Sequence, residues 1–385
     1  MSPIIRAEVN PEILVWARES IGLMPSEAAK KARVPTERLL AWETGKAQPT
    51  LRQARLLAKA YRRPSAFFYL KVPPVEPPEI PDLRRLPHPV GYMPPQLVYE
   101  IRKARFRREI ALEMYRALGE PVPDFSLQAS FEESSEVVGA RMREFLGFSL
   151  EEQTSCSSPY DALNAWMSAV EAAGILVFQF SYIDVSLVRG FSIADVPMPT
   201  ISLNGADSPR ARAFTLLHEL CHLALGTGGI CDLHESGDGV DVEVFSNAAA
   251  AAALVPAEAI LGIPTVANNR DGPRWSDLQL GDLSTRFQVS KEVILRRLLT
   301  LGKTTRAFYR NKREEFKEEY KQLRTQGGGF LPYHRMILRN NGPAFTSLVL
   351  DAYQQQAITA IDVSRYLGDI KVNYIPAIQG ELANA

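Results

Sequence analysis

Residues 214–225, FTLLHELCHLAL, place two histidines four positions apart, with a glutamate directly after the first. Residues four apart on a helix lie above one another on one face, so His218 and His222 can ligate one ion. Glu219 is turned about a quarter circle away, which suits a general base that does not ligate the metal. The alternative is an apolar helix with two hydrogen-bonded histidines; chance gives this spacing about one time in a hundred or less. The sequence therefore predicts an H-E-x-x-H metal site.

A catalytic zinc site needs a third protein ligand and keeps its fourth position open. The downstream candidates are one histidine and several carboxylates: His234, Glu235, Asp238, Asp241, Glu243 and Glu258. The first four lie in a glycine-containing polar loop, HESGDGVD, whereas Glu243 begins the helical run EVFSNAAAAAALVP. A helix holds a ligand more rigidly than a loop does. An exposed acid favoured by the helix dipole fits Glu243 equally well, so the residues alone leave the choice open.

FTLLHELCH followed by EVFSNAAAAAALVP resembles the signature of the ImmA/IrrE family of metallopeptidases. The resemblance implies a zincin-like α+β fold with an open zinc site. It implies that the ligands are His218, His222 and Glu243, that Glu219 is the general base, and that Asn247 is the asparagine following the third ligand. From the donor set, Zn²⁺ is the expected cofactor, and Mn²⁺ could substitute.

Other parts of the chain resemble the same family. GFSIADVPMPTISLNG, residues 190–205, is similar to the strand pair ahead of the zinc helix, and we expect an edge strand near 186–204 to bind a substrate peptide. Residues 283–302 resemble the segment that closes the peptidase domain, where a packed helix pair is the favoured interpretation. Cys221 and Ser246 stand where the family usually has glycine and alanine, beside the site but not at ligand positions.

Apolar periodicity near the N-terminus predicts short helices at 10–21, 25–32, 36–43, 50–61 and 64–69. Thr36 is the expected N-cap of the third, and Gly45 ends it. The stretch SEAAKKARVPTERLLAWETGKAQPTLRQARLLAKAY resembles the Cro/C1-type (XRE) helix-turn-helix. If this region binds DNA, four residues of the third helix face the major groove: Thr36, Glu37, Arg38 and Ala41. Lys46 and Arg52 are then placed to contact phosphates. The alternative is a protein-binding or dimerisation module.

The 385 residues exceed one comfortable core, so we expect a multidomain α+β protein. We expect four segments: an all-α helix-turn-helix domain at 1–71, a proline-rich linker at 72–95, a peptidase domain at 96–302 and a helical C-terminal region at 303–385. Three cysteines without C-x-x-C spacing predict no disulfide framework, and Cys221 is expected as a small buried hydrophobe.

The charge composition and the apolar segments restrict the partners. Formal charge balances at 44 basic and 44 acidic residues, so nucleic-acid binding requires a local patch. Neither a signal-peptide pattern nor a membrane-spanning apolar run is present, so we expect a cytoplasmic protein without a membrane partner.

Two functional hypotheses follow. In the first, the protein is a zinc endopeptidase and DNA-binding regulator. It binds a DNA operator and cleaves a helix-turn-helix repressor as its protein substrate. A homodimer is the expected oligomeric state. The second is a non-proteolytic repressor or antitoxin whose peptidase-like domain binds a ribonuclease-type toxin or senses a ligand. An intact ligand set favours the first, while Cys221 and Ser246 favour the second slightly.

Overall fold

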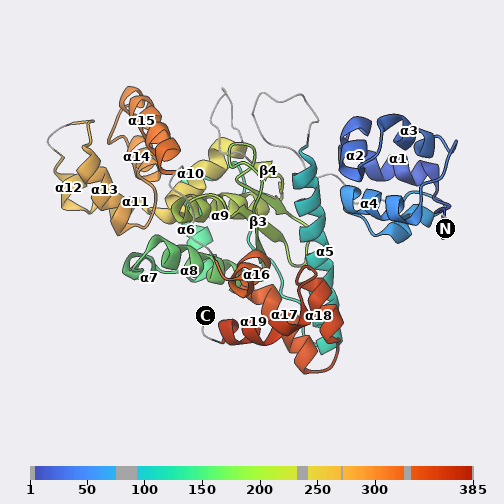
Figure 1. The fold of residues 1–385 in the computed structure, drawn as a ribbon. Helices are drawn as coiled ribbons and strands as arrows, with labels where there is room; N and C mark the ends of the chain where they lie inside the picture. Colours follow the sequence, from blue (N-terminus) through green and yellow to red (C-terminus); the bar gives the residue numbers. More distant parts are fainter. Residues whose placement is uncertain (1–4, 75–92, 232–241, 270–271, 325–330, 384–385) are drawn as a thin grey trace. The chain divides into compact units, whose positions relative to one another are not determined.

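The computed structural model describes residues 5–74, 93–231, 242–269, 272–324 and 331–383 (Figure 1). Contacts between Cα atoms divide the chain into two compact units. The division falls inside helix α5 (Pro95–Leu118), after Lys103. Most of the proline-rich segment expected at 72–95 lies outside the described residues, as does the GGG sequence at 327–329.

The N-terminal unit contains the helices expected from the sequence: α1 (Pro11–Glu19), α2 (Pro25–Ala32), α3 (Thr36–Glu43), α4 (Leu51–Tyr61) and the 3₁₀ helix η1 (Ser65–Tyr69). The large side chains Trp42, Tyr61 and Phe68 are fully buried in its core. The prediction that Thr36 caps α3 is wrong, because Thr36 is the first helical residue and Pro35 occupies the N-cap position. Proline pre-sets the extended backbone needed there, although it offers no side-chain acceptor.

The larger unit is built around a small sheet. Within the described residues it has four strands in the order β1-β3-β2-β4: β1 (Leu176–Phe180), β3 (Thr200–Asn204), β2 (Gly190–Ile193) and β4 (Ile230–Cys231). Strands β1 and β3 are parallel, whereas β2 is antiparallel to both β3 and β4. The expectation of an edge strand within 186–204 is therefore wrong: β2 and β3 are interior, and β4 takes the edge. The sequence did not predict β4, because a strand of two residues is too short to show the alternation of apolar and polar residues.

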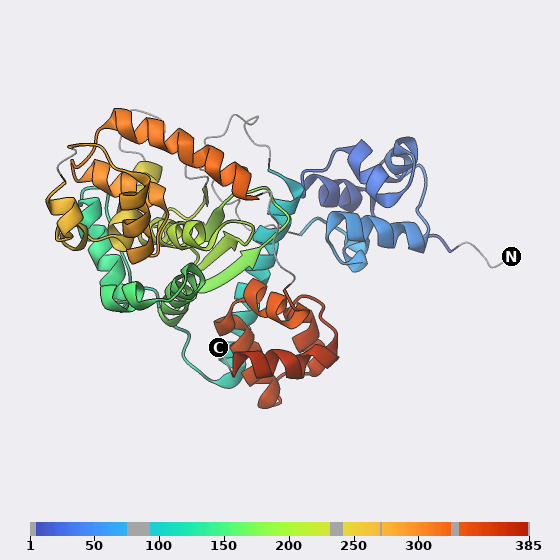
Figure 2. The same ribbon diagram turned by 60° about the vertical axis from the view of Figure 1, so that its left-hand side comes forward.

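Helices cover both faces of this sheet. On one face α8 (Pro159–Ala172) and α9 (Pro209–Ala224) pack against Val177, Ile201 and Leu203. On the other face, Phe345 of α17 (Pro343–Gln354) meets Phe178 edge-on, with ring centroids 5.7 Å apart. Figure 2 shows the C-terminal helices gathered beside the sheet: α16 (Tyr333–Asn341), α17, α18 (Ala360–Tyr366) and α19 (Ile375–Leu382), with the 3₁₀ helix η2 (Val372–Tyr374).

The alanine-rich helix α10 (Val242–Leu254) packs against both α9 and α6 (Ser135–Leu146). Its small side chains permit a close approach: a Cβ added to Gly139 of α6 would lie 2.8 Å from the carbonyl oxygen of Ala249 and the amide nitrogen of Ala253. The alanine side chains of α10 thus bring α6 to within backbone contact.

The remaining helices are α7 (Leu150–Ser155), α11 (Ala257–Leu261), α12 (Pro264–Ala267), α13 (Asp277–Arg286), α14 (Lys291–Thr300) and α15 (Arg306–Arg324). Helices α13 and α14 bury Leu283, Ile294 and Leu298 in the main core. This burial supports the packed helix pair expected near 283–302.

Candidate metal centre

Helix α9 carries the H-E-x-x-H sequence through the middle of the core. Ser208 caps it by accepting a hydrogen bond from the amide of Ala211, and Pro209 occupies its first turn, where no amide donor is needed. Every residue from Arg212 to Ala224 is buried. The helix is therefore enclosed on all sides, and its two histidines lie in an apolar environment.

The side chains of His218, His222 and Glu243 converge between α9 and the first turn of α10. The two Nε2 atoms are 3.1 Å apart, and each lies 3.3 Å from one carboxylate oxygen of Glu243. All three side chains are buried, and their ligand atoms lie within 4.8 Å of one another. Glu258 begins α11 and is not part of this group, whereas His234, Glu235, Asp238 and Asp241 lie outside the described residues.

The charges of this group are set by burial and by mutual contact. Burial alone would raise the pKa of Glu243, but hydrogen bonds with His218 and His222 outweigh it and hold that pKa well below its ordinary value. Burial lowers the pKa of His218, which favours the neutral, ligating form. The group thus combines an ionised carboxylate with a neutral imidazole.

His222 is oriented by a residue beyond the helix. The Thr227 hydroxyl is 3.4 Å from the carbonyl oxygen of His222, to which it donates, and 3.2 Å from the Nδ1 atom. In the tautomer that carries its proton on Nδ1, this nitrogen donates to the hydroxyl, and Nε2 keeps its lone pair for a cation. Two imidazole nitrogens and one carboxylate, converging in a buried space, are the donor set of an open zinc site. The residues present therefore fit a divalent metal.

Glu219 lies on the side of α9 that faces β2. The Ser192 hydroxyl donates a hydrogen bond of 2.7 Å to Oε2 of Glu219, and both side chains are fully buried. Sequence analysis did not identify Ser192, because its 27-residue separation from Glu219 leaves no local spacing signal. Asn247, one turn beyond Glu243 on α10, is buried, and neither its Oδ1 nor its Nδ2 has a hydrogen-bond partner among the described residues.

Comparison with protein-family models agrees with this geometry. The model of the IrrE N-terminal-like domain, a metallopeptidase family, matches residues 170–299, which include α9, α10 and the sheet. A helix-turn-helix model matches residues 14–68. The chain joins a helix-turn-helix domain to an IrrE N-terminal-like domain. A search of curated proteins found no match to the chain.

From the sequence, Tyr182, Arg212 and His234 are candidate donors to the oxyanion of a tetrahedral intermediate. Tyr182 lies in the loop after β1 with 92% of its surface exposed. Arg212 is buried, and its guanidinium donates to Oε1 of Gln179 over 2.6 Å. His234 lies outside the described residues.

Cys221 is fully buried and free, which confirms its expected role as a small core residue, and burial raises the pKa of its thiol to about 12.

The helix-turn-helix domain exposes one side of α3. Glu37 and Arg38 are exposed, whereas Thr36 and Ala41 are half-buried. Leu39 and Trp42 turn inward to the core. Lys46, in the turn after α3, and Arg52, on α4, are also exposed. The residues expected to contact DNA are thus accessible side chains on α3 and on the segment that follows it.

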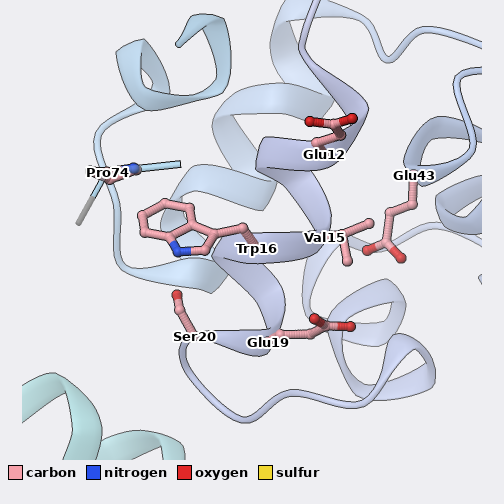
Figure 3. A pocket seen from close by; sticks show the side chains of 7 residues that line it. All are labelled: Glu12, Val15, Trp16, Glu19, Ser20, Glu43 and Pro74. Carbon is pink, nitrogen blue, oxygen red and sulfur yellow. The ribbon is translucent and has the colours of Figure 1, made fainter. Parts of the chain in front are cut away.

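Figure 3 shows a pocket of ≈ 600 Å³ elsewhere on the helix-turn-helix domain. Trp16 is at its centre, and three carboxylates line it: Glu12, Glu19 and Glu43. The buried Arg18 donates to Glu43 over 2.7 Å and so fixes the end of α3 against α1. An acidic lining repels phosphate, which makes this pocket unsuited to DNA contact.

Among the described residues, no helix is long and apolar enough to cross a membrane.

Proposed function

We propose that this chain is a zinc-dependent endopeptidase and DNA-binding regulator that cleaves a helix-turn-helix transcriptional repressor. The observation that carries the proposal is the convergence of His218, His222 and Glu243 beside Glu219, inside a domain of a metallopeptidase family. The donor set favours Zn²⁺ over harder cations, which prefer oxygen ligands alone.

The chemistry divides between the metal and the chain. Bound zinc supplies a Lewis acid that activates water and polarises the peptide carbonyl. Glu219 accepts the proton of the attacking water and returns it to the leaving amine, so its carboxylate is regenerated at the end of the cycle. Because Glu219 follows His218 directly on a rigid helix, the backbone of α9 fixes its Cα relative to those of the ligands His218 and His222.

The substrate is inferred from the other domain. A helix-turn-helix domain offers a way to associate with a matching regulator, and tethering raises the effective concentration of that regulator at the peptidase site. An extended peptide needs a free sheet edge for β-augmentation, and the edge nearest β2 belongs to β4. The cut then falls in a loop or linker of the partner. Proline removes the amide donors that such pairing needs, so the chain's own residues 72–95 are a poor substrate.

DNA binding by the helix-turn-helix domain completes the proposal. Base reading is assigned to Arg38, which is exposed on α3, together with Thr36, Glu37 and Ala41; their accessibility supports this assignment. Lys46 and Arg52 are exposed cations placed for phosphates. We expect a homodimer on a pseudo-palindromic operator near the protein's own gene.

A non-proteolytic antitoxin or repressor that grips a ribonuclease-type toxin or senses a ligand is the second candidate. It is favoured by Cys221 and Ser246, which place larger side chains than glycine and alanine in the buried interface between α9 and α10. The two candidates differ in whether a partner is cut or only bound.

The deciding experiment incubates the zinc-loaded protein with regulators encoded beside its gene and maps fragments by mass spectrometry. Glu219→Gln is the matched control, since it removes the base and no ligand; it should keep about one zinc per chain and lose cleavage. A fragment that forms equally with both proteins removes Glu219 from the mechanism. Cuts only within residues 72–95 of this chain, or binding without any cut, contradict the proposed endopeptidase.

A further inference from the structure

The carboxylate of Glu219 lies against strand β2. Its Oε2 accepts the hydroxyl proton of Ser192, and its Oε1 lies 3.3 Å from the position where a Cβ would stand on Gly190. Residues two apart on a strand face the same side, so Gly190 and Ser192 both face α9. That same Cβ would lie only 2.7 Å from Cγ2 of Thr215, so only glycine lets β2 come this close.

Ser192 is itself fixed from both sides of its strand. Its amide donates to the carbonyl oxygen of Gly229 over 2.9 Å, and it stands opposite Ile201 in the register with β3. With the backbone held and the side chain fully buried, the hydroxyl has little freedom to turn elsewhere. An ionised carboxylate only accepts, so the hydroxyl is the donor, and hydrogen bonds of this charge-assisted kind are about twice as strong as neutral ones.

A general base must hold its carboxylate in a defined position relative to the reacting water. A glutamate side chain has three rotatable bonds, and Glu219 directly follows the candidate ligand His218. Displacing a reacting group by about 1 Å costs on the order of 100-fold in rate. A fixed donor on Oε2 restricts these rotations and so holds the carboxylate in one orientation.

We propose that Ser192 is a positioning residue that fixes the Glu219 carboxylate against β2 for proton transfer. This inference rests on the proposed peptidase function for its catalytic consequence, but the contact itself can be tested without activity.

The activity-independent test is a double-mutant cycle in thermal unfolding with Ser192→Ala and Glu219→Gln. Removing the donor from a buried carboxylate should lower the Tm of the otherwise native protein by roughly 3–10 °C. In the Glu219→Gln background the partner is a neutral amide, so the loss should be less than about half as large. Equal losses in the two backgrounds overturn the proposal, because they show that the hydroxyl does not act through the Glu219 charge.

The kinetic test uses cleavage of the partner regulator. Ser192→Ala should lower kcat by about 10- to 100-fold with KM and zinc content unchanged. Ser192→Thr, which keeps the donor, should restore kcat to within a few-fold. Ser202→Ala is the matched control: it removes an equally buried hydroxyl from the adjacent strand β3, where its register places it on the opposite face of the sheet.

The outcomes separate the two proposals. An unchanged kcat in Ser192→Ala, or an equal loss in Ser202→Ala, overturns the positioning role. If the native protein cleaves no regulator, the proposed peptidase function fails, and the unfolding cycle still decides whether Ser192 holds Glu219. Should Ser192→Ala not fold, Ser192→Cys, which keeps the size of the side chain with a weaker donor, gives an intermediate loss in the same measurements.

Discussion

A single methyl group added at Gly139 of α6 should push α6 away from α10, the helix that carries Glu243. The Cβ of Gly139→Ala would lie 2.8 Å from Ala252 Cβ and equally close to backbone atoms of Ala249 and Ala253. Ordinary contacts are about 3.5–4.0 Å, so α6 and α10 would have to move apart by roughly 0.7 Å or more. Backbone atoms in the middle of a helix cannot rotate away as a flexible side chain can.

The magnitude follows from two opposing effects. Overpacking of a core costs about 1–3 kcal/mol, and the better helix propensity of alanine returns about 0.5–1 kcal/mol. The expected net loss of unfolding free energy is about 1 kcal/mol, within a range of about 0–2.5 kcal/mol, which corresponds to a fall in Tm of up to roughly 10 °C for a unit of this size. Because Glu243 stands in the first turn of α10, the same shift should weaken zinc binding by about 10-fold.

Thermal unfolding and chelator competition measure these two effects. Gly281→Ala is the matched control, since Gly281 lies within α13 and a Cβ there meets nothing within 4 Å. It should raise the unfolding free energy by about 0.5–1 kcal/mol and leave zinc affinity unchanged. If Gly139→Ala is as stable as Gly281→Ala and binds zinc equally well, the tight α6–α10 contact does not support the site.

Three further predictions concern the ligands, DNA and pH. Metal analysis of the purified protein should find about one zinc per chain. Replacing any one of the proposed ligands by alanine should remove this zinc: His218, His222 or Glu243. In gel shifts, Arg38→Ala should relax base preference, whereas Lys46→Ala should weaken binding to all sequences alike and lower the salt slope by about 0.9. DNA binding that neither substitution changes favours a protein-binding module. Burial raises the pKa of Glu171 to about 8, so the folded state holds a proton that the unfolded chain releases near pH 4.5. The unfolding free energy should therefore fall as pH rises from about 4.5 to 8, and denaturant titrations at pH 6 and 8 should show a smaller fall in Glu171→Gln.

The sequence determined those features that depend on neighbours along the chain. The four-residue spacing placed His218 and His222 on one face of a helix, and the structure has them there on α9. The helix-turn-helix elements were predicted within about one to two residues, because apolar periodicity and turn residues act locally. The failure at Thr36 is also local: both Thr36 and Pro35 suit the start of a helix, and sequence preference alone did not separate them.

Tertiary structure decided everything that joins distant parts of the chain. From the residues alone Glu243 was one of six candidate ligands, and it stands with the histidines only because α10 packs against α9 at a distance set by small side chains. Strand β4 forms an edge through its pairing with β2, and Ser192 reaches Glu219 from the face of the sheet that α9 covers. Such contacts form when two elements bury their faces together, and the register in which they do so leaves no periodic trace in either sequence.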